Sequence, residues 1–414
     1  MIGKDMTIFK SADNKPSLLV LTSTFPRWEN DPEPAFVYEL SRRLCLSFDV
    51  TVLAPRAPGS KDRENMAGLH VIRFPYFFRC WEDLATHSGG ILNRLRSNPF
   101  NYLLVPLFLF GQLLALFRLL RQERFALIHA HWLIPQGLMA VIGLTLARRR
   151  IPLVCTSHGG DLYALRGTIF QSLKRWVINH SQALTVVSRA MQSSIVVMGV
   201  VPDKVQVISM GVDLKHSFTP DSTVDRSASE LLFVGRLVEK KGLRILIAAM
   251  PKVFTKHPDM RLTVAGAGPL EIELRELAQR LDISDKVDFL GMVMQSKLPA
   301  LYRRATLAIF PFLVAKSGDQ EGFGLVQVEA MGCGCPVIAG DLPAIHDSIA
   351  HEETGLLVPP GNPEILANTV LRALNDPDLC FRMAREARKS AIEQFDWEII
   401  AEKYVGLYSK IINT

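Results

Sequence analysis

Two glutamates, Glu321 and Glu329, stand eight residues apart, with a flexible Gly-Phe-Gly step and then an apolar helical pattern between them. At ~1.5 Å and ~100° per residue, helical positions eight apart lie ~12 Å apart and within ~80° in azimuth. We therefore expect both carboxylates to face one elongated cleft. That separation suits a ligand with two polyhydroxyl ends joined by phosphates, the shape of a nucleotide-sugar. A freely solvated position for Glu329 is disfavoured because its neighbours Val328 and Ala330 are apolar.

A second candidate is the basic loop GRLVEKKG at 235–242, where Arg236 and Lys241 bring two cations to one glycine-flanked turn. A diphosphate leaving group needs such cations, because negative charge grows on its distal phosphate as the bond to the sugar breaks. A solvated basic turn is the alternative interpretation. The glutamate segment favours the functional one, since both loops follow strands of the same predicted sheet.

The stretch Gly266-Ala267-Gly268 resembles the start of a dinucleotide fingerprint, but the third glycine position holds Glu271. The NAD motif therefore fails. A turn beside a nucleotide and a purely structural turn both remain open.

In the first half, His129 and His131 follow one predicted strand, and His158 and Asp161 follow the next. A metal site is disfavoured because the residues after His131 supply no carboxylate ligand. We expect His131 to donate or accept a hydrogen bond at a bound sugar, with His158 and Asp161 as second candidates.

The elements that must position these residues are short apolar runs alternating with helical patterns. Such runs, bounded by Pro, Gly and polar residues, predict parallel strands covered on both faces. The fold class is α/β, with two doubly wound Rossmann-like domains facing each other across a cleft. The predicted strands are 18–21, 50–53, 71–73, 127–129, 153–155, 184–187 and 205–208, then 231–234, 262–265, 287–290, 307–310, 337–339 and 356–358.

A polar stretch rich in Ser, Thr and Asp separates the two series of strands. We expect an N-terminal acceptor-binding domain at 1–213, a linker at 214–229 and a C-terminal nucleotide-sugar-binding domain at 230–394. A final helix at 395–414 is expected to pack back on the first domain.

Composition narrows the class of protein. A chain of 414 residues with 21% charged residues is globular and long enough for two domains. The net charge of +6 is too small to indicate nucleic acid, and it fits an anionic substrate or an anionic membrane surface. The six cysteines form no CxxC pair, and the N-terminus lacks a hydrophobic signal core. We expect a reducing, cytoplasmic location without disulfides or structural zinc.

The apolar run at 101–120 approaches the length of a membrane span, and the aromatic segment FPYFFRCW precedes it at 74–81. Pro106, Gln112 and the strand that begins at Leu127 disfavour a transmembrane helix. Two interpretations stay open: a core helix, or a helix on the surface of an anionic membrane. The arginines that would contact headgroups are Arg94, Arg96, Arg118, Arg121, Arg124 and 148–150.

Taken together, the motifs resemble those of the retaining glycosyltransferases of family 4, which have the GT-B fold. The resemblance rests on the Glu-x7-Glu segment and GRLVEKKG, together with VSRAM at 187–191, GVD at 211–213 and TGLLVPPGNP at 354–363. It covers nearly the whole chain. It implies sugar transfer from a nucleotide-sugar with retained anomeric configuration and without a cofactor or required metal.

The resemblance also implies roles for individual residues. Arg236 and Lys241 would bind the diphosphate, Glu329 the ribose, and Glu321 with the amides after it the sugar, while His131 would lie over the sugar. The expected catalytic set is His131, Glu321, Arg236 and Lys241; the donor-binding set adds Gly266, Val293, Gly322, Phe323, Gly324, Leu325 and Glu329; the acceptor side holds Thr24, Arg27, His158 and Asp161.

The implied mechanism has no enzymatic nucleophile, because the departing phosphate takes the acceptor's proton on the same face of the sugar. Two positions depart from the family pattern. The usual Gly-Gly loop after the first strand is replaced by residues 22–34, which read TSTFPRWENDPEP, and the usual asparagine before GVD is Met210. Acceptor contacts therefore do not carry over.

The expected function is transfer of a hexose to a glycan or lipid-linked acceptor in the synthesis of a cell-surface polysaccharide or glycolipid. Peripheral attachment to the inner face of the cytoplasmic membrane stays open, and no nucleic-acid partner is expected. Two rivals remain: a nucleotide-sugar epimerase of the same fold, and a catalytically inactive nucleotide-sugar-binding protein.

Overall fold

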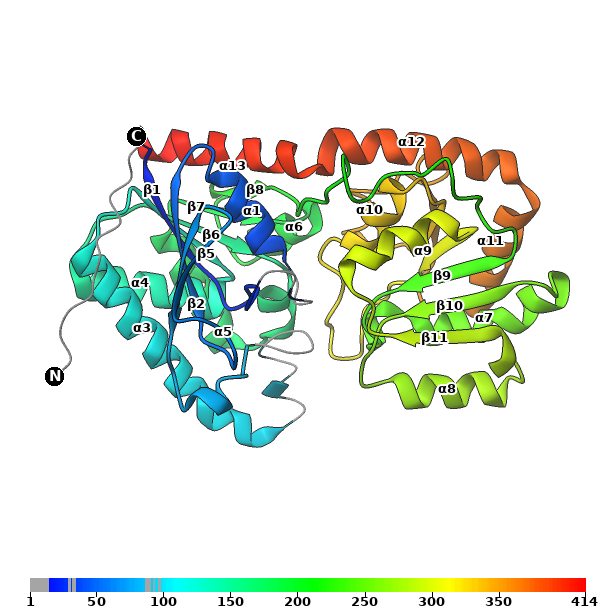
Figure 1. The fold of residues 1–414 in the computed structure, drawn as a ribbon, viewed down its shortest axis with the longest axis horizontal. Helices are drawn as coiled ribbons and strands as arrows, with labels where there is room; N and C mark the ends of the chain where they lie inside the picture. Colours follow the sequence, from blue (N-terminus) through cyan, green and yellow to red (C-terminus); the bar gives the residue numbers. More distant parts are fainter. Residues whose placement is uncertain (1–14, 29–30, 32–34, 86–90, 92–93, 96–97) are drawn as a thin grey trace. The chain divides into compact units, whose positions relative to one another are not determined.

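The computed structural model describes residues 15–28, 31, 35–85, 91, 94–95 and 98–414. Contacts divide the chain into two compact units. One comprises Met1–Cys155, His180–Gln182 and Val405–Thr414, and the other comprises Thr156–Asn179 and Ala183–Tyr404. The chain builds two sheets with helices around them (Figure 1).

The first sheet has eight strands in the order β3-β4-β2-β1-β5-β6-β7-β8. β1 lies at its centre and pairs in parallel with β2 on one side and β5 on the other. The strands are β1 (Ser17–Leu21), β2 (Asp49–Pro55), β3 (Arg63–Met66), β4 (Leu69–Phe74), β5 (Leu127–His131), β6 (Leu153–Ser157), β7 (Ala183–Val186) and β8 (Val205–Val207); the helices of this half are α1 (Phe36–Leu44), α3 (Leu104–Gln122), α4 (Leu138–Ala147), α5 (Thr168–His180) and α6 (Arg189–Val197).

The second sheet has six parallel strands in the order β11-β10-β9-β12-β13-β14. Its core is aliphatic, with Leu231, Leu262 and Leu307 at the strand starts and helices α7 and α11 against them. The strands are β9 (Glu230–Val234), β10 (Arg261–Ala265), β11 (Val287–Gly291), β12 (Leu307–Phe310), β13 (Val337–Gly340) and β14 (Leu356–Val358); the helices are α7 (Leu243–Lys256), α8 (Glu271–Arg280), α9 (Leu298–Arg304), α10 (Leu325–Gly332), α11 (Pro363–Asn375), α12 (Pro377–Phe395) and α13 (Trp397–Ile412).

Every predicted strand is present, with ends that shift by no more than two residues. The structure corrects one expectation, because the first sheet is not purely parallel. β3 forms an antiparallel hairpin with β4. Its sequence, Arg-Glu-Asn-Met, has no apolar run that could identify it, and its pairing is supported by an ion pair of 3.0 Å between Glu64 and the buried Arg73 of β4.

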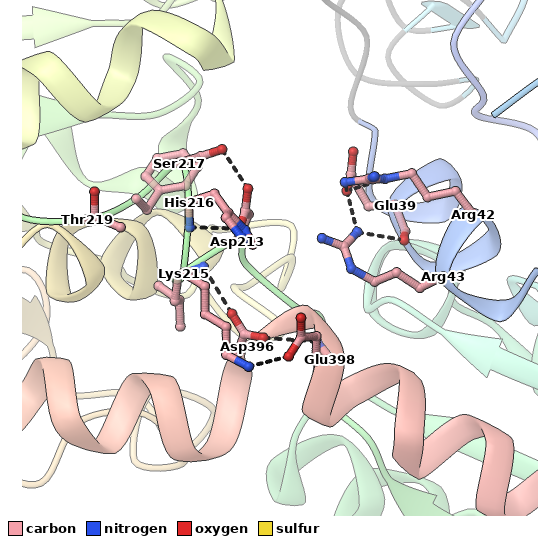
Figure 2. Close-up of polar contacts among 12 residues, drawn as sticks. Glu39, Arg42, Arg43, Asp213, Lys215, His216, Ser217, Thr219, Asp396 and Glu398 are labelled. Carbon is pink, nitrogen blue, oxygen red and sulfur yellow. Dashed lines mark hydrogen bonds and ion pairs between the residues drawn. The ribbon is translucent and has the colours of Figure 1, made fainter. Parts of the chain in front are cut away.

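The start of the polar stretch between the two series of strands, and the residues just before it, contact the junction of α12 and α13. Val212 forms a parallel bridge with Asp396, and the Asp396 carboxylate accepts a hydrogen bond from the amide of Leu214. Lys215 pairs with Glu398 at the start of α13 (Figure 2). A Cβ at Gly211 would lie 2.4 Å from the Trp397 ring, so only glycine permits this close approach.

Helix α13 packs against strands of the first sheet through two buried tyrosines. The Tyr404 hydroxyl lies 3.2 Å from Thr156 Oγ1 in β6 and 3.3 Å from Thr185 Oγ1 in β7. One turn later, Tyr408 Oη lies 2.7 Å from His129 Nδ1 in β5. These contacts attach the C-terminal helix to the middle of the first sheet.

Candidate functional site

The basic loop follows β9, where the order in which strands are added to the second sheet reverses. From β9 the chain adds β10 and β11 on one side and then β12, β13 and β14 on the other. Ligands of such sheets bind beyond the carboxyl ends of the strands at this switch point. The loops after β9 and β12 flank it. They carry Lys241 and Glu321, respectively.

Glycine holds the basic loop in place at both ends. Gly242 has φ +71°, and a Cβ there would lie 1.8 Å from the carbonyl oxygen of Pro311. Gly266 has φ +148°, and a Cβ there would lie 1.9 Å from the carbonyl oxygen of Gly235. The turn after β10 therefore packs directly behind the basic loop, which gives the expected donor residue Gly266 a structural role.

Lys241 and Glu321 form an ion pair, with Nζ 2.7 Å from Oε2 and each side chain 14% exposed. The Lys241 ammonium also lies 4.9 Å from the Phe312 ring centroid. Burial raises the pKa of Glu321, but the charges of Lys241 and Lys240 outweigh it and hold the pKa below its ordinary value. Glu321 is therefore a carboxylate at neutral pH.

A second ion pair lies beside the first. Lys240 Nζ is 3.1 Å from Asp319 Oδ1, and the amide of Leu313 donates to the carbonyl of Lys240 at 3.0 Å. Arg236 is half-buried in the same loop. The loop after β9 is thus joined to the loop after β12 by charge as well as by backbone.

The sequence-based geometry of the two glutamates was wrong in one respect. α10 begins only at Leu325, because Gly324 takes the left-handed conformation at φ +86°. Glu321 therefore lies in the loop before the helix, and a helical rise over eight residues does not relate it to Glu329. Only Glu329 is helical, and it is buried at 5% exposure, as its apolar neighbours predicted.

Two neutral side chains, those of Tyr302 and Gln295, donate hydrogen bonds to Glu329. The fully buried Tyr302 of α9 donates its hydroxyl to Oε2 of Glu329 at 3.1 Å. Burial raises the pKa of Glu329 to about 7, against the opposing effects of hydrogen bonds from Tyr302 and Gln295 and the charge of Lys241. Val293, an expected donor residue, lies half-buried in the loop that brings Gln295 to this carboxyl.

Sequence reasoning missed Tyr302. It lies 27 residues from its partner in a helix that reads LPALYRR, where nothing distinguishes it from an ordinary core tyrosine. The segment Gly322-Phe323-Gly324 leads into the first turn of α10, whose initial amides have no acceptor within the helix. The Phe323 ring is buried 5.2 Å from the Phe395 ring, so the side chain belongs to the core. Leu325, the first helical residue, is half-buried.

In the first sheet the corresponding switch point lies between β1 and β5. His131 is the last residue of β5 and is buried. Its ring centroid lies 4.1 Å from that of His129, which in turn contacts Tyr408. The C-terminal helix therefore supports His131 through a neighbouring ring.

The loop after β1 carries Thr24 and Arg27. Thr22 Oγ1 donates to the Thr24 carbonyl at 2.9 Å, which forms a tight turn. The Arg27 guanidinium stacks on Trp28 and forms two hydrogen bonds with the Asp31 carboxylate, at 2.8 and 2.6 Å. Residues 29–30 and 32–34 of this loop lie outside the described residues.

At the end of β6, Ser157 Oγ donates to Asp161 Oδ1 at 2.8 Å, and this hydrogen bond holds the loop that follows the strand. Burial lowers the pKa of His158 to about 3, so its imidazole is neutral at pH 7. Among the described residues, no three His, Cys, Asp or Glu side chains gather as a metal site. The expected acceptor side thus combines a neutral imidazole with the Asp161 carboxylate and with an arginine that is paired to Asp31.

Comparison with known proteins agrees with this architecture. The model of Glycosyltransferase Family 4 matches residues 35–216, and the model of Glycosyl transferases group 1 matches residues 219–390. An uncharacterized glycosyltransferase of Methanocaldococcus jannaschii is 30% identical over 277 residues, covering 63% of this chain and 69% of that relative. Phosphatidyl-myo-inositol mannosyltransferase of Mycolicibacterium smegmatis is 28% identical, covering 88% of this chain and 86% of that one.

Among solved structures, sucrose-phosphate synthase from Thermosynechococcus elongatus superposes with a TM-score of 0.75 at 23% identity, covering 96% of this chain and all of that chain. At that identity the likeness shows the fold, which is GT-B. With both family models, the relative from M. jannaschii and this fold in agreement, the chain belongs to glycosyltransferase family 4 and is a glycosyltransferase.

Proposed function

We propose that this glycosyltransferase moves a hexose from a nucleoside-diphosphate sugar to a glycan or lipid-linked acceptor, with retention of anomeric configuration, in the synthesis of a cell-surface polysaccharide or glycolipid. The observation that carries the proposal is the Lys241–Glu321 ion pair at the switch point of the second sheet. The pair places a cation that can bind phosphate next to a carboxylate that can accept hydrogen bonds from sugar hydroxyls.

The donor would lie across this edge in a defined order. Arg236 and Lys241 stabilise the negative charge that grows on the departing diphosphate. Glu321 accepts hydrogen bonds from sugar hydroxyls, and Glu329 accepts them from the ribose. The Glu321 carboxylate is neutralised by Lys241 and is therefore suited to orienting the sugar rather than attacking it.

In the proposed reaction, the acceptor oxygen forms a bond to the anomeric carbon as the bond from that carbon to the phosphate oxygen breaks on the same face. The acceptor's proton passes to the leaving phosphate oxygen. Lys241 and Arg236 would favour this step, because two cations in one loop stabilise the charge that develops on the phosphate. His131 would donate or accept a hydrogen bond at the sugar.

The two cations of the loop would take the place that a divalent metal holds in other diphosphate sites, so we propose that no metal is required. Turnover should persist in excess chelator. Loss of activity with EDTA that Mg²⁺ or Mn²⁺ restores would contradict this part of the proposal.

A lipid-linked acceptor is supported by the name of the M. smegmatis relative, which acts on a phosphatidyl-myo-inositol. For the present chain we propose a cytoplasmic enzyme that uses an acceptor at the inner face of the cytoplasmic membrane. The nucleotide base of its donor is the first property to identify.

The test begins with thermal shift against UDP-, GDP- and ADP-hexoses, since a donor at 100 times its dissociation constant adds ~2.7 kcal/mol of apparent stability. The stabilising donor is then incubated with membrane extract, and the anomeric configuration of the product is read by NMR. Retained configuration supports the proposal, and inversion overturns it. Isomerisation of the donor without acceptor would indicate an epimerase, and binding without turnover in any extract would indicate an inactive sensor.

A further inference from the structure

Helix α3 presents an apolar stripe to solvent. At ~100° per residue, positions 103, 107, 110, 114, 117, 118 and 121 fall within ~60° of one direction. Leu103, Leu107 and Phe110 on this stripe are exposed, and Phe110 is 65% exposed. The opposite side of the helix is buried, with Phe108 against Phe74 and Leu116 against Gly143 of α4.

Aromatic side chains extend the stripe at the N-terminal end of the helix. The short helix η2 (Pro99–Leu103) leads into α3 and exposes Phe100, at 79%, and Tyr102. The segment Phe77–Trp81, which includes η1 (Arg79–Trp81), follows directly on Pro75 and Tyr76, which contact Gly111 and Phe108 of α3. In it Phe78 and Trp81 are exposed, and the Phe77 ring contacts both.

Charge on this part of the chain is mostly positive, although Arg94 is paired with Asp83 just before it. Residues 84–160 contain eight arginines, no lysine and one acid, Glu123. Arg118 and Arg121 close the exposed stripe at the C-terminal end of α3, where Arg149 of the neighbouring loop donates to the Leu120 carbonyl at 3.0 Å. Arg96 of the expected headgroup contacts lies outside the described residues. The apolar stripe therefore ends in a cluster of arginines at the ends of α3 and α4.

Burial distinguishes among the three roles open to this segment. The span Pro99–Gln122 is long and apolar enough to cross a membrane, but its other side is built into the first sheet's helical layer beside α4 (Figure 1). A core helix would be mostly buried, whereas only 39% of its apolar window is. Half-buried packing with an exposed apolar stripe is the pattern of a helix that lies in a bilayer surface.

We propose that α3 and the aromatic residues of η1 and η2 form a docking surface for an anionic lipid bilayer. Phe78, Trp81, Phe100 and Phe110 enter the region between headgroups and acyl chains, and Arg118 and Arg121 contact acidic headgroups. The chain then binds the membrane from one side and does not span it. A vesicle-binding assay contains no nucleotide-sugar, so its result is independent of the proposed reaction.

The experiment is flotation of the full chain with vesicles of phosphatidylcholine alone and of phosphatidylcholine with phosphatidylglycerol. The chain is expected to float with the anionic vesicles and much less with the neutral ones. Phe100→Ser with Phe110→Ser should lower the partition coefficient at least about tenfold, because two exposed rings leave the bilayer. Phe381→Ser on α12, an equally exposed phenylalanine elsewhere, is the matched control and should float like the parent chain.

Arg118→Glu with Arg121→Glu should remove the preference for anionic vesicles, and added salt should weaken binding of the parent chain. Resistance to alkaline carbonate extraction would show insertion and overturn the surface geometry. No flotation with either vesicle, or equal flotation of the parent and the aromatic variant, would overturn the proposal. A third result would also overturn the proposal: the parent chain self-associates in solution, the aromatic variant does not, and neither binds vesicles. The surface would then join two copies of this chain.

Discussion

The two sheets have the same strand order around their switch points and differ in the chemistry there. In the second sheet, two ion pairs, Lys241–Glu321 and Lys240–Asp319, join the loop after β9 to the loop after β12. In the first sheet, the last residue of β5 is the buried His131, and the loop after β6 holds a neutral His158. Two lysines beside the strand ends suit a diphosphate, whereas imidazoles at that place suit hydroxyl groups. In the loop after β1, the charge of Arg27 is balanced by Asp31. The same architecture can thus serve the donor in one half and the acceptor in the other.

The largest effect expected is that of Lys241→Ala. The change removes the cation that we propose stabilises the departing phosphate, and it leaves Glu321 without its main partner. Loss of one preorganised charge-stabilising group costs about 100-fold or more in turnover. Steady-state kinetics with the identified donor measure this. Turnover should fall more than nucleotide affinity, because the charge grows toward the transition state.

Lys240→Ala is the matched control for that change. Lys240 belongs to the same loop but pairs with Asp319, so its loss should affect turnover much less. Equal losses for the two lysines would show that the loop acts through its overall charge. A loss of affinity as large as the loss of turnover for Lys241→Ala would indicate ground-state binding alone.

His131→Ala tests the edge of the first sheet. If His131 contacts the sugar during transfer, kcat should fall about tenfold, the equivalent of one hydrogen bond of roughly 1.4 kcal/mol. The dissociation constant of the nucleoside diphosphate should stay within experimental error. A weakened nucleotide affinity would remove the division between the two edges.

The raised pKa of Glu329 gives the charged edge a pH dependence. If Glu329 binds the ribose as proposed, its ionised carboxylate is the better acceptor of hydrogen bonds from the ribose hydroxyls. Nucleotide affinity should then rise by up to about tenfold between pH 6 and pH 8, because the pKa of Glu329 is raised to about 7. For folding the sign is opposite. The raised folded pKa makes a contribution to the free energy of unfolding that is present below 4.5 and lost as pH rises through about 7.

Glu329→Gln should abolish both trends, which calorimetric titration and thermal melts across pH can follow in parallel. Glu321 has a lowered pKa, so its own contribution to stability is present above 4.5 and lost as pH falls below it. A parent chain with the same pH dependence as Glu329→Gln would mean that Glu329 does not titrate near neutrality.

Tyr302→Phe should have the smallest effect, a loss of nucleotide affinity of about fivefold, because a single neutral hydrogen bond to Glu329 is worth about 1 kcal/mol. Tyr404→Phe removes another buried tyrosine hydroxyl, the one between Thr156 and Thr185, and is the control for stability. It should destabilise the fold by a similar amount and leave nucleotide affinity unchanged. Equal affinities for the two variants would deny Tyr302 a role in positioning Glu329.

The sequence predicted the strands well because buried parallel strands are continuous apolar runs, and it placed the polar motifs after them. It missed β3, whose four residues, three of them polar, are held by pairing with β4 rather than by propensity. The helical spacing of Glu321 and Glu329 was wrong because Gly324 turns the chain just before α10. Tyr302 was beyond prediction, since its contact with Glu329 joins two helices and leaves no local pattern. Burial on each side of α3 was equally undetermined by the sequence, which left core and surface roles open.

The central claim is that the edge of the second sheet holds the nucleotide of the donor. Calorimetry of UDP and GDP with the parent chain, Glu329→Gln and His131→Ala tests it most directly. The account predicts that one of the two nucleotides binds the parent chain, that Glu329→Gln weakens this binding at least about fivefold through the lost ribose contact, and that His131→Ala does not change it. Unchanged affinity in Glu329→Gln, or an equal loss in His131→Ala, would contradict it.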